Sequence, residues 1–219
     1  MVPQDYSALH DTFPGSGFVT LKAPRASPKG IAVPAAQEVG GYTSCAHALK
    51  LILDLSSKGS WSADNIHEVA CAVLDENDCR TSLWDCVRGV SLHGVKSEDG
   101  ASQIEPGVLR FQRVKRQHVT TALGHGLPVA CIIDPTKMSK VNTRVTAGGA
   151  VAACLIGLSG GQKVSIRVFS RHPVDAEIPA ELLEDEGIAS CFWCIKASKV
   201  AVNRCMLEPA HDAASLPEN

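Results

Sequence analysis

A cysteine at the start of an apolar segment is the residue of this sequence best placed for chemistry. Cys45 follows the small-residue turn Tyr42-Thr43-Ser44, and the residues from there to Gly59 are dense in Ala, Leu and Ile with the spacing of a buried helix. A thiol in the first helical turn lies near free backbone N–H groups and the positive end of the helix dipole. We therefore expect Cys45 to have a lowered pKa and to be nucleophilic. The alternative is a buried structural cysteine, since free cysteine is among the most buried residue types.

The residues before Cys45 resemble the nucleophile region of papain-like cysteine peptidases. Gln37 lies eight positions upstream, and a loop with Gly40 and Gly41 leads to Ser44 and the thiol. In that family, a glutamine side chain and the backbone N–H of the cysteine form the oxyanion hole, which stabilises charge developing on the scissile carbonyl. The resemblance implies this role for Gln37 and the role of nucleophile for Cys45.

The order of the following segments extends the resemblance along the chain. Two segments with helical patterns, 61–79 and 82–99, follow the central helix, and strand patterns dominate from Glu105 onward. The resemblance implies a papain-like two-lobe α+β fold, with a helical lobe that carries Cys45 at a helix N-terminus and a lobe built from an antiparallel β-sheet or barrel. The expected divisions are an extended arm at 1–36, the helical lobe at 37–104, the β lobe at 105–207 and a flexible tail at 208–219.

The strands that should carry the rest of a catalytic triad lack its residues. The segment 148–158, GGAVAACLIGL, resembles the strand that a catalytic histidine opens in papain-like enzymes, and 163–173, KVSIRVFSRHP, resembles the strand with the asparagine that orients it. Depending on the alignment, Gly149 or Val151 takes the place of the histidine, and Val168 takes that of the asparagine. None of them accepts a proton. Loss of a triad base typically lowers the rate on the order of 10⁴- to 10⁶-fold, so we expect catalysis to be impaired.

Other histidines offer a replacement base. His172, just past the second of these strands, is the best placed, although the following Pro173 indicates a loop. His47 lies two positions after Cys45, so the two side chains diverge around the helix. The histidines that we expect to be solvated, on predicted helices and turns, are His67, His93, His118 and His125.

Composition excludes several classes of protein. With 219 residues, 45% hydrophobic and 20% charged, the chain predicts one globular domain with an ample core. A net charge of −2 predicts no general attraction to nucleic acid or to anionic membranes. The longest apolar run, 148–158, is too short to span a bilayer, and the N-terminal residues lack the pattern of a secretion signal. We therefore expect a cytoplasmic protein.

The nine cysteines predict reduced, buried thiols rather than a disulfide framework, because their number is odd and several lie in apolar segments. Cys191 and Cys194 form the one CxxC pair. A strand pattern around them sends the two thiols to opposite faces, and the sequence has no second pair to complete a zinc site. We expect no metal and no cofactor. A redox protein built on this pair would need both sulfurs together at a helix start.

Two functions remain open. The first is a degenerate papain-like peptidase homologue that serves as a structural or protein- or peptide-binding module, with Gly40, Gly41, Ser44, Gly149 and Val151 lining the binding groove. The alternative is an active thiol hydrolase, a peptidase or isopeptidase, that uses Cys45 with His172 as a relocated base. The composition fits a subunit of a larger assembly as well as a free protein.

Overall fold

The computed structural model describes residues 33, 39, 42–57, 59–77, 79–138, 149–160, 162–185, 187–195 and 203–204. Gln37, Gly40 and Gly41 lie outside this part of the chain, as do all of the predicted tail and, Val33 apart, the predicted arm. Within the described residues, no helix combines the length and the apolar character that crossing a membrane requires.

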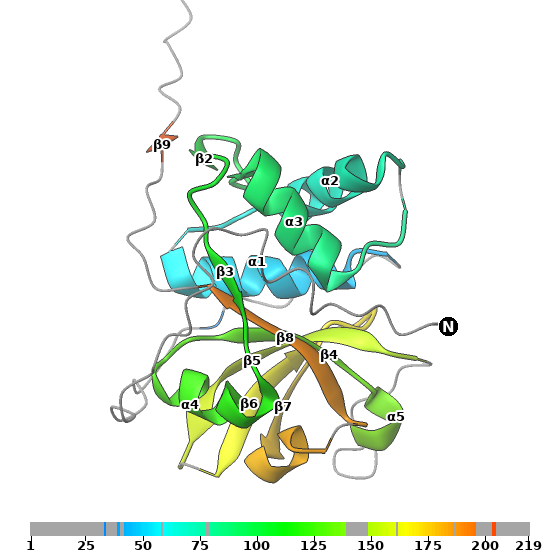
Figure 1. The fold of residues 1–219 in the computed structure, drawn as a ribbon, viewed down its shortest axis with the longest axis vertical. Helices are drawn as coiled ribbons and strands as arrows, with labels where there is room; N and C mark the ends of the chain where they lie inside the picture. The colour runs from blue at the N-terminus through cyan, green and yellow to red at the C-terminus, as the bar shows by residue number, and fades with distance from the viewer. Residues whose placement is uncertain are drawn as a thin grey trace, which may run out of the picture.

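Three helices form one side of the molecule. α1 (Ser44–Ser57) lies between the sheet and the other two helices, α2 (Ala63–Leu74) and α3 (Leu83–His93) (Figure 1). Two serines cap the starts of α2 and α3, as short hydroxyl side chains do at exposed N–H groups. The Ser62 hydroxyl accepts a hydrogen bond from the Asn65 N–H at 3.1 Å, and Ser82 forms a reciprocal capping box with Asp85.

An antiparallel sheet of six strands, in the order β3-β8-β4-β5-β6-β7, forms the other side (Figure 1). Its strands are β3 (Phe111–Arg113), β4 (Val129–Ile133), β5 (Val151–Ser159), β6 (Lys163–Val168), β7 (Val174–Pro179) and β8 (Ala189–Ile195). A smaller sheet joins β1 (Val95–Lys96), β2 (Ser102–Ile104) and β9 (Asn203–Arg204). Short helices at η2 (Arg116–His118), α4 (Val119–Gly124), α5 (Pro135–Met138) and η3 (Ala180–Leu183) connect the strands.

The two faces of the large sheet cover two separate cores, because side chains alternate between faces along a strand. In β5, Ala152 and Cys154 pack against α1 and its neighbouring helices, whereas Ala153 and Leu155 pack on the opposite face against α4 and η3. Small residues on the inner face allow α1 to lie close to the sheet. The helix that carries Cys45 is therefore held rigidly between α2, α3 and β5.

Candidate functional site

Cys45 is the second residue of α1, so the predicted place at a helix start is confirmed. Its side chain is buried, with 7% of its surface exposed, in the core that also contains Cys86 of α3 and Cys154 of β5. The thiol therefore lies in apolar surroundings rather than on an open surface.

Burial raises the pKa of the Cys45 thiol to about 11. A hydrogen bond with the Ser44 side chain and the positive charge of Arg80 act in the opposite direction, whereas Asp85 and Cys191 raise the pKa further. The prediction of a lowered pKa was wrong. Burial destabilises the charged thiolate by more than the helix dipole stabilises it. At neutral pH, only about one thiol in ten thousand is ionised at such a pKa.

The strand positions that the resemblance assigns to the other triad members carry no proton acceptor. Gly149 is exposed just before β5, and a Cβ added to it would meet no atom within 4 Å. Val151, the first residue of β5, is half-buried against the second core. Val168 ends β6, is fully buried, and pairs with Ala153 and Val174 in the neighbouring strands.

His172 lies, as predicted, in the loop after β6, where it is exposed and its backbone carbonyl accepts a hydrogen bond from the Ser170 hydroxyl at 2.6 Å. Of the described residues, those that shift the pKa of Cys45 most are Ser44, Arg80, Asp85 and Cys191, and His172 is not among them. A catalytic role for His172 stays a prediction.

His47 is occupied in a different contact. Its imidazole stacks on the ring of Phe169, which follows β6, with 6.1 Å between the ring centroids. Burial lowers its pKa, and the charged groups that act on it are Asp64, Lys50 and Glu98. None of these three is among the groups that act most on the pKa of Cys45.

Cys191 is the neighbour of Cys45 that sequence reasoning missed. Its backbone adopts φ 55°, in the left-handed region, where the pairing of β4 with β8 shifts register between Ala130 and Ile132. The irregularity brings its thiol near Cys131 as well as Cys45, since it raises the pKa of both. No glycine, asparagine or aspartate marks this bulge in the sequence.

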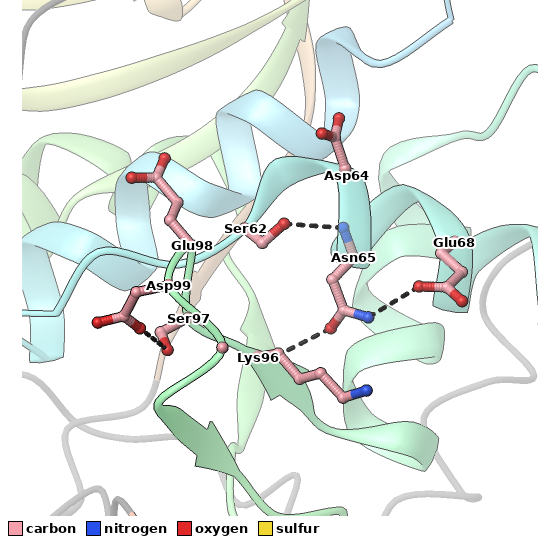
Figure 2. Close-up of a pocket in the computed structure, with 9 residues that line it drawn as sticks. Ser62, Asp64, Asn65, Glu68, Lys96, Ser97, Glu98 and Asp99 are labelled. Atoms are coloured by element: carbon pink, nitrogen blue, oxygen red, sulfur yellow. Dashed lines mark hydrogen bonds between the residues drawn. The ribbon is translucent and has the colours of Figure 1, made fainter. Parts of the chain in front are cut away.

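A hollow of about 600 Å³ lies on the helical lobe, between the start of α2 and the turn from β1 to β2 (Figure 2). Asp64, Glu68, Glu98 and Asp99 give it an acidic wall. Its central polar group, the Asn65 amide, accepts a hydrogen bond from the Lys96 N–H at 2.9 Å and donates one to Glu68 at 3.0 Å. These contacts hold β1 against α2. We therefore interpret the polar residues of the hollow as stabilising this packing rather than as a binding site.

Two of the histidines that were expected to be solvated are not. His67 is half-buried and contacts the Cys71 thiol and the Thr81 hydroxyl. The Nε2 atom of His125 is buried and has no hydrogen-bond partner among the described residues. Both predictions were wrong because a helical position alone does not show which face the neighbouring segments cover.

The sequence matches no known protein-family model and no curated protein. Solved structures do resemble the chain. Xylellain, a cysteine protease from Xylella fastidiosa, superposes with a TM-score of 0.55 at 14% identity, covering 80% of this chain and 91% of its own. Digestive procathepsin L 3 of the Tenebrio molitor larval midgut gives a TM-score of 0.53 at 15% identity, covering 81% of this chain and 74% of its own.

The chain has the fold of papain-like cysteine proteases. The predicted fold class is confirmed, and with it the arrangement of a helical part beside an antiparallel sheet. In this papain-like fold, Cys45 lies at the start of the central helix. Gly149 lies just before β5, and Val151 and Val168 lie on β5 and β6, packed against the core on the other face of the sheet. Gln37 lies outside the described residues, so its role in an oxyanion hole stays a prediction.

Proposed function

We propose that this chain is a papain-like protein without efficient peptidase activity, which serves as a structural or protein-binding module. The observation that carries the proposal is the state of Cys45. Its thiol is buried, its pKa is raised to about 11, and Arg80, Asp85 and Cys191 are the charged or ionisable groups that act on it most. A nucleophilic cysteine needs the opposite surroundings, with partial exposure and a nearby imidazolium that stabilises the thiolate.

The absence of a proton acceptor at the triad positions of the strands is a second reason to expect no efficient peptidase activity. General-base catalysis contributes typically about 10²- to 10⁴-fold to a rate and needs a proton acceptor within hydrogen-bonding reach of the nucleophile. Gly149, Val151 and Val168 cannot supply one. A chain with this fold and without these groups keeps the shape of a peptidase but loses the step that cleaves the bond, because function depends on the site and not on the fold.

The ligand that fits the groove is an extended peptide or a segment of a partner protein. Papain-like folds present a groove between their lobes, and extended peptides bind such surfaces through their main chain. Gly149 leaves open space beside the start of β5, and the half-buried Ser44 contributes one polar contact. Val151 packs against the second core, on the face of the sheet away from α1, so the predicted contact through its side chain is not part of this groove. Gly40 and Gly41 complete the proposed groove.

Hydrolysis is tested with a denatured protein as substrate, by sequencing the new N-termini by mass spectrometry. We expect the native chain and the Cys45→Ala variant to give the same background of N-termini between about pH 5 and pH 9. Cleavage that depends on Cys45 would overturn the proposal in favour of an active thiol hydrolase. Loss of that cleavage in His172→Ala would then identify the base.

Binding is tested with a peptide selected from a random displayed library against the native protein. We expect Gly149→Phe to weaken its binding at least tenfold, because the ring fills the open space beside β5. His93→Phe, which places the same phenyl ring at the exposed far end of α3, is the control. Equal binding by all three proteins would place the peptide elsewhere and contradict the proposed groove.

A further inference from the structure

Two thiols, an imidazole and a hydroxyl meet where α2 ends. His67 and Cys71 are one turn apart on α2, and the His67 Nε2 atom lies 3.6 Å from the Cys71 sulfur. The Cys79 sulfur lies 3.3 Å from the Cys71 sulfur. The Thr81 hydroxyl lies 3.4 Å from the His67 Nδ1 atom, so the imidazole is held from both of its nitrogens.

The backbone explains how these side chains come together. α2 ends at Asp75, which adopts the left-handed conformation with φ 56°. The N–H groups of Asp75 and Glu76 then donate to the carbonyls of Ala72 and Cys71, at 3.4 and 3.2 Å, which closes the helix and turns the chain back. Cys79 thereby returns to the last turns of α2.

We propose that Cys71 and Cys79 are a dithiol that hydrogen peroxide oxidises to a disulfide, with Cys71 as the nucleophile, His67 as its base and Cys79 as the resolving thiol. The proposal does not rest on the peptidase fold or on Cys45. It rests on the distances among four side chains, to none of which the sequence analysis assigned a role.

The reaction is balanced with one molecule of peroxide. His67 takes the proton of Cys71, and the thiolate attacks one peroxide oxygen, so that an S–O bond forms and the O–O bond breaks. The departing hydroxide takes a proton from the imidazolium and leaves as water. The Cys79 sulfur then attacks the sulfenic acid sulfur, an S–S bond forms, and the hydroxyl leaves with the Cys79 proton as a second water. Two thiols lose two electrons in total, and peroxide gains them.

The hydrogen bonds distinguish the roles of the two thiols. Cys79 donates to the Cys71 sulfur, and this hydrogen bond is the main cause that raises the pKa of Cys79 to about 11. Cys79 therefore keeps its proton. The Cys71 sulfur accepts the hydrogen bond from Cys79, donates a longer one to the Cys79 carbonyl at 3.9 Å, and lies 3.6 Å from the imidazole. A disulfide has an S–S length of about 2 Å, so side-chain rotation over a small distance joins the sulfurs.

Exposure separates this pair from the fully buried thiols. Cys79 is half-buried and Cys71 is 6% exposed, close to Cys45 at 7%, whereas Cys86, Cys131 and Cys154 have no exposed surface. Peroxide is small enough to reach a narrow opening. In the described residues, no set of three or more His, Cys, Asp or Glu side chains is arranged to hold a metal ion, which favours redox chemistry at this pair over a zinc site.

The sequence allows a direct assay. Trypsin cleaves after Lys58 and Arg80 and nowhere between them, so the peptide 59–80 contains Cys71 and Cys79 and no other cysteine. Reduced native protein is treated with a small excess of hydrogen peroxide, denatured, alkylated and digested. We expect the peptide 59–80 to carry neither alkyl group and to have two hydrogens fewer than the free dithiol, while the peptides with Cys131 and Cys154 stay alkylated.

Three substitutions and one control substitution test the proposal. Cys79→Ser should trap Cys71 as a sulfenic acid that dimedone labels, and Cys71→Ser should leave Cys79 alkylated. In the Cys79→Ser background, His67→Ala should slow dimedone labelling at least about tenfold, whereas His93→Ala should leave the rate unchanged. A melting curve shows that each variant is folded. Full alkylation of the native peptide after peroxide, or unchanged labelling without His67, would overturn the proposal.

Discussion

The imidazole of His47 stacks on the ring of Phe169, with 6.1 Å between the ring centroids. The contact joins the helix that carries Cys45 to the end of β6, the strand on which the resemblance places an orienting asparagine. A histidine two residues after Cys45 thus packs between α1 and the residue that follows β6. Burial lowers its pKa, so it packs as a neutral ring.

Because the pKa of the His47 imidazole is lowered, we expect the protein to lose stability in mild acid. This pKa is lower in the folded chain than the unfolded value of about 6.5, so the unfolded state binds more protons as the pH falls through that value. The stabilisation is complete above about pH 7 and decreases below about pH 6.5. The measurement is urea unfolding across this range for native protein and His47→Gln. The variant should lose less stability on acidification, and an identical pH dependence would contradict the buried neutral ring.

The buried ion pair on α1 predicts a large effect of one substitution. The Asp54 carboxylate lies 2.6 Å from the Lys50 ammonium and accepts the Trp61 N–H at 2.8 Å, and its side chain is 5% exposed. Asp54→Ala leaves the Lys50 charge buried with Glu98 as its remaining carboxylate, at 3.2 Å, so the free energy of unfolding should fall by about 3 kcal/mol.

Glu98→Gln is the control for this pair, because the Glu98 side chain is 41% exposed. Solvent screens its interaction with Lys50, and the loss should be below about 1 kcal/mol. Equal losses in Asp54→Ala and Glu98→Gln, measured by urea unfolding, would show that burial does not set the strength of this network.

Gly89 predicts a steric effect between α2 and α3. A Cβ at this position would lie 2.7 Å from the Val69 carbonyl oxygen and the Ala70 nitrogen, both backbone atoms of α2. Gly89→Ala must push the helices apart, at a cost of about 1–3 kcal/mol. Gly149→Ala meets no atom within 4 Å and should change stability by less than about 0.5 kcal/mol. A neutral Gly89→Ala would contradict the close helix contact.

The fold could be predicted from the sequence because its signals are local. Ser62 and Ser82 precede apolar patterns with helical spacing, and the continuous apolar runs around Cys131 and Cys154 indicate buried strands. The position of Cys45 at a helix start followed from the same patterns.

The state of the site could not be predicted, because it depends on contacts between distant segments. The pKa of Cys45 depends on how completely α3 and the sheet cover it, and Cys191 reaches it through a bulge without a sequence mark. The cluster of His67, Cys71 and Cys79 depends on the turn at Asp75. Cys71 and Cys79 are eight residues apart and form no motif that marks them as a pair in the sequence.

The pH dependence of Cys45 alkylation by iodoacetamide tests the central claim most directly. Comparison of native protein with Cys45→Ala isolates one signal among nine thiols. We predict slow labelling at neutral pH that rises about tenfold per pH unit toward the raised pKa of about 11. Rapid labelling at about pH 5 to 6 would mean that a nearby imidazolium stabilises the thiolate. That result would contradict a non-hydrolytic module and favour an active thiol hydrolase.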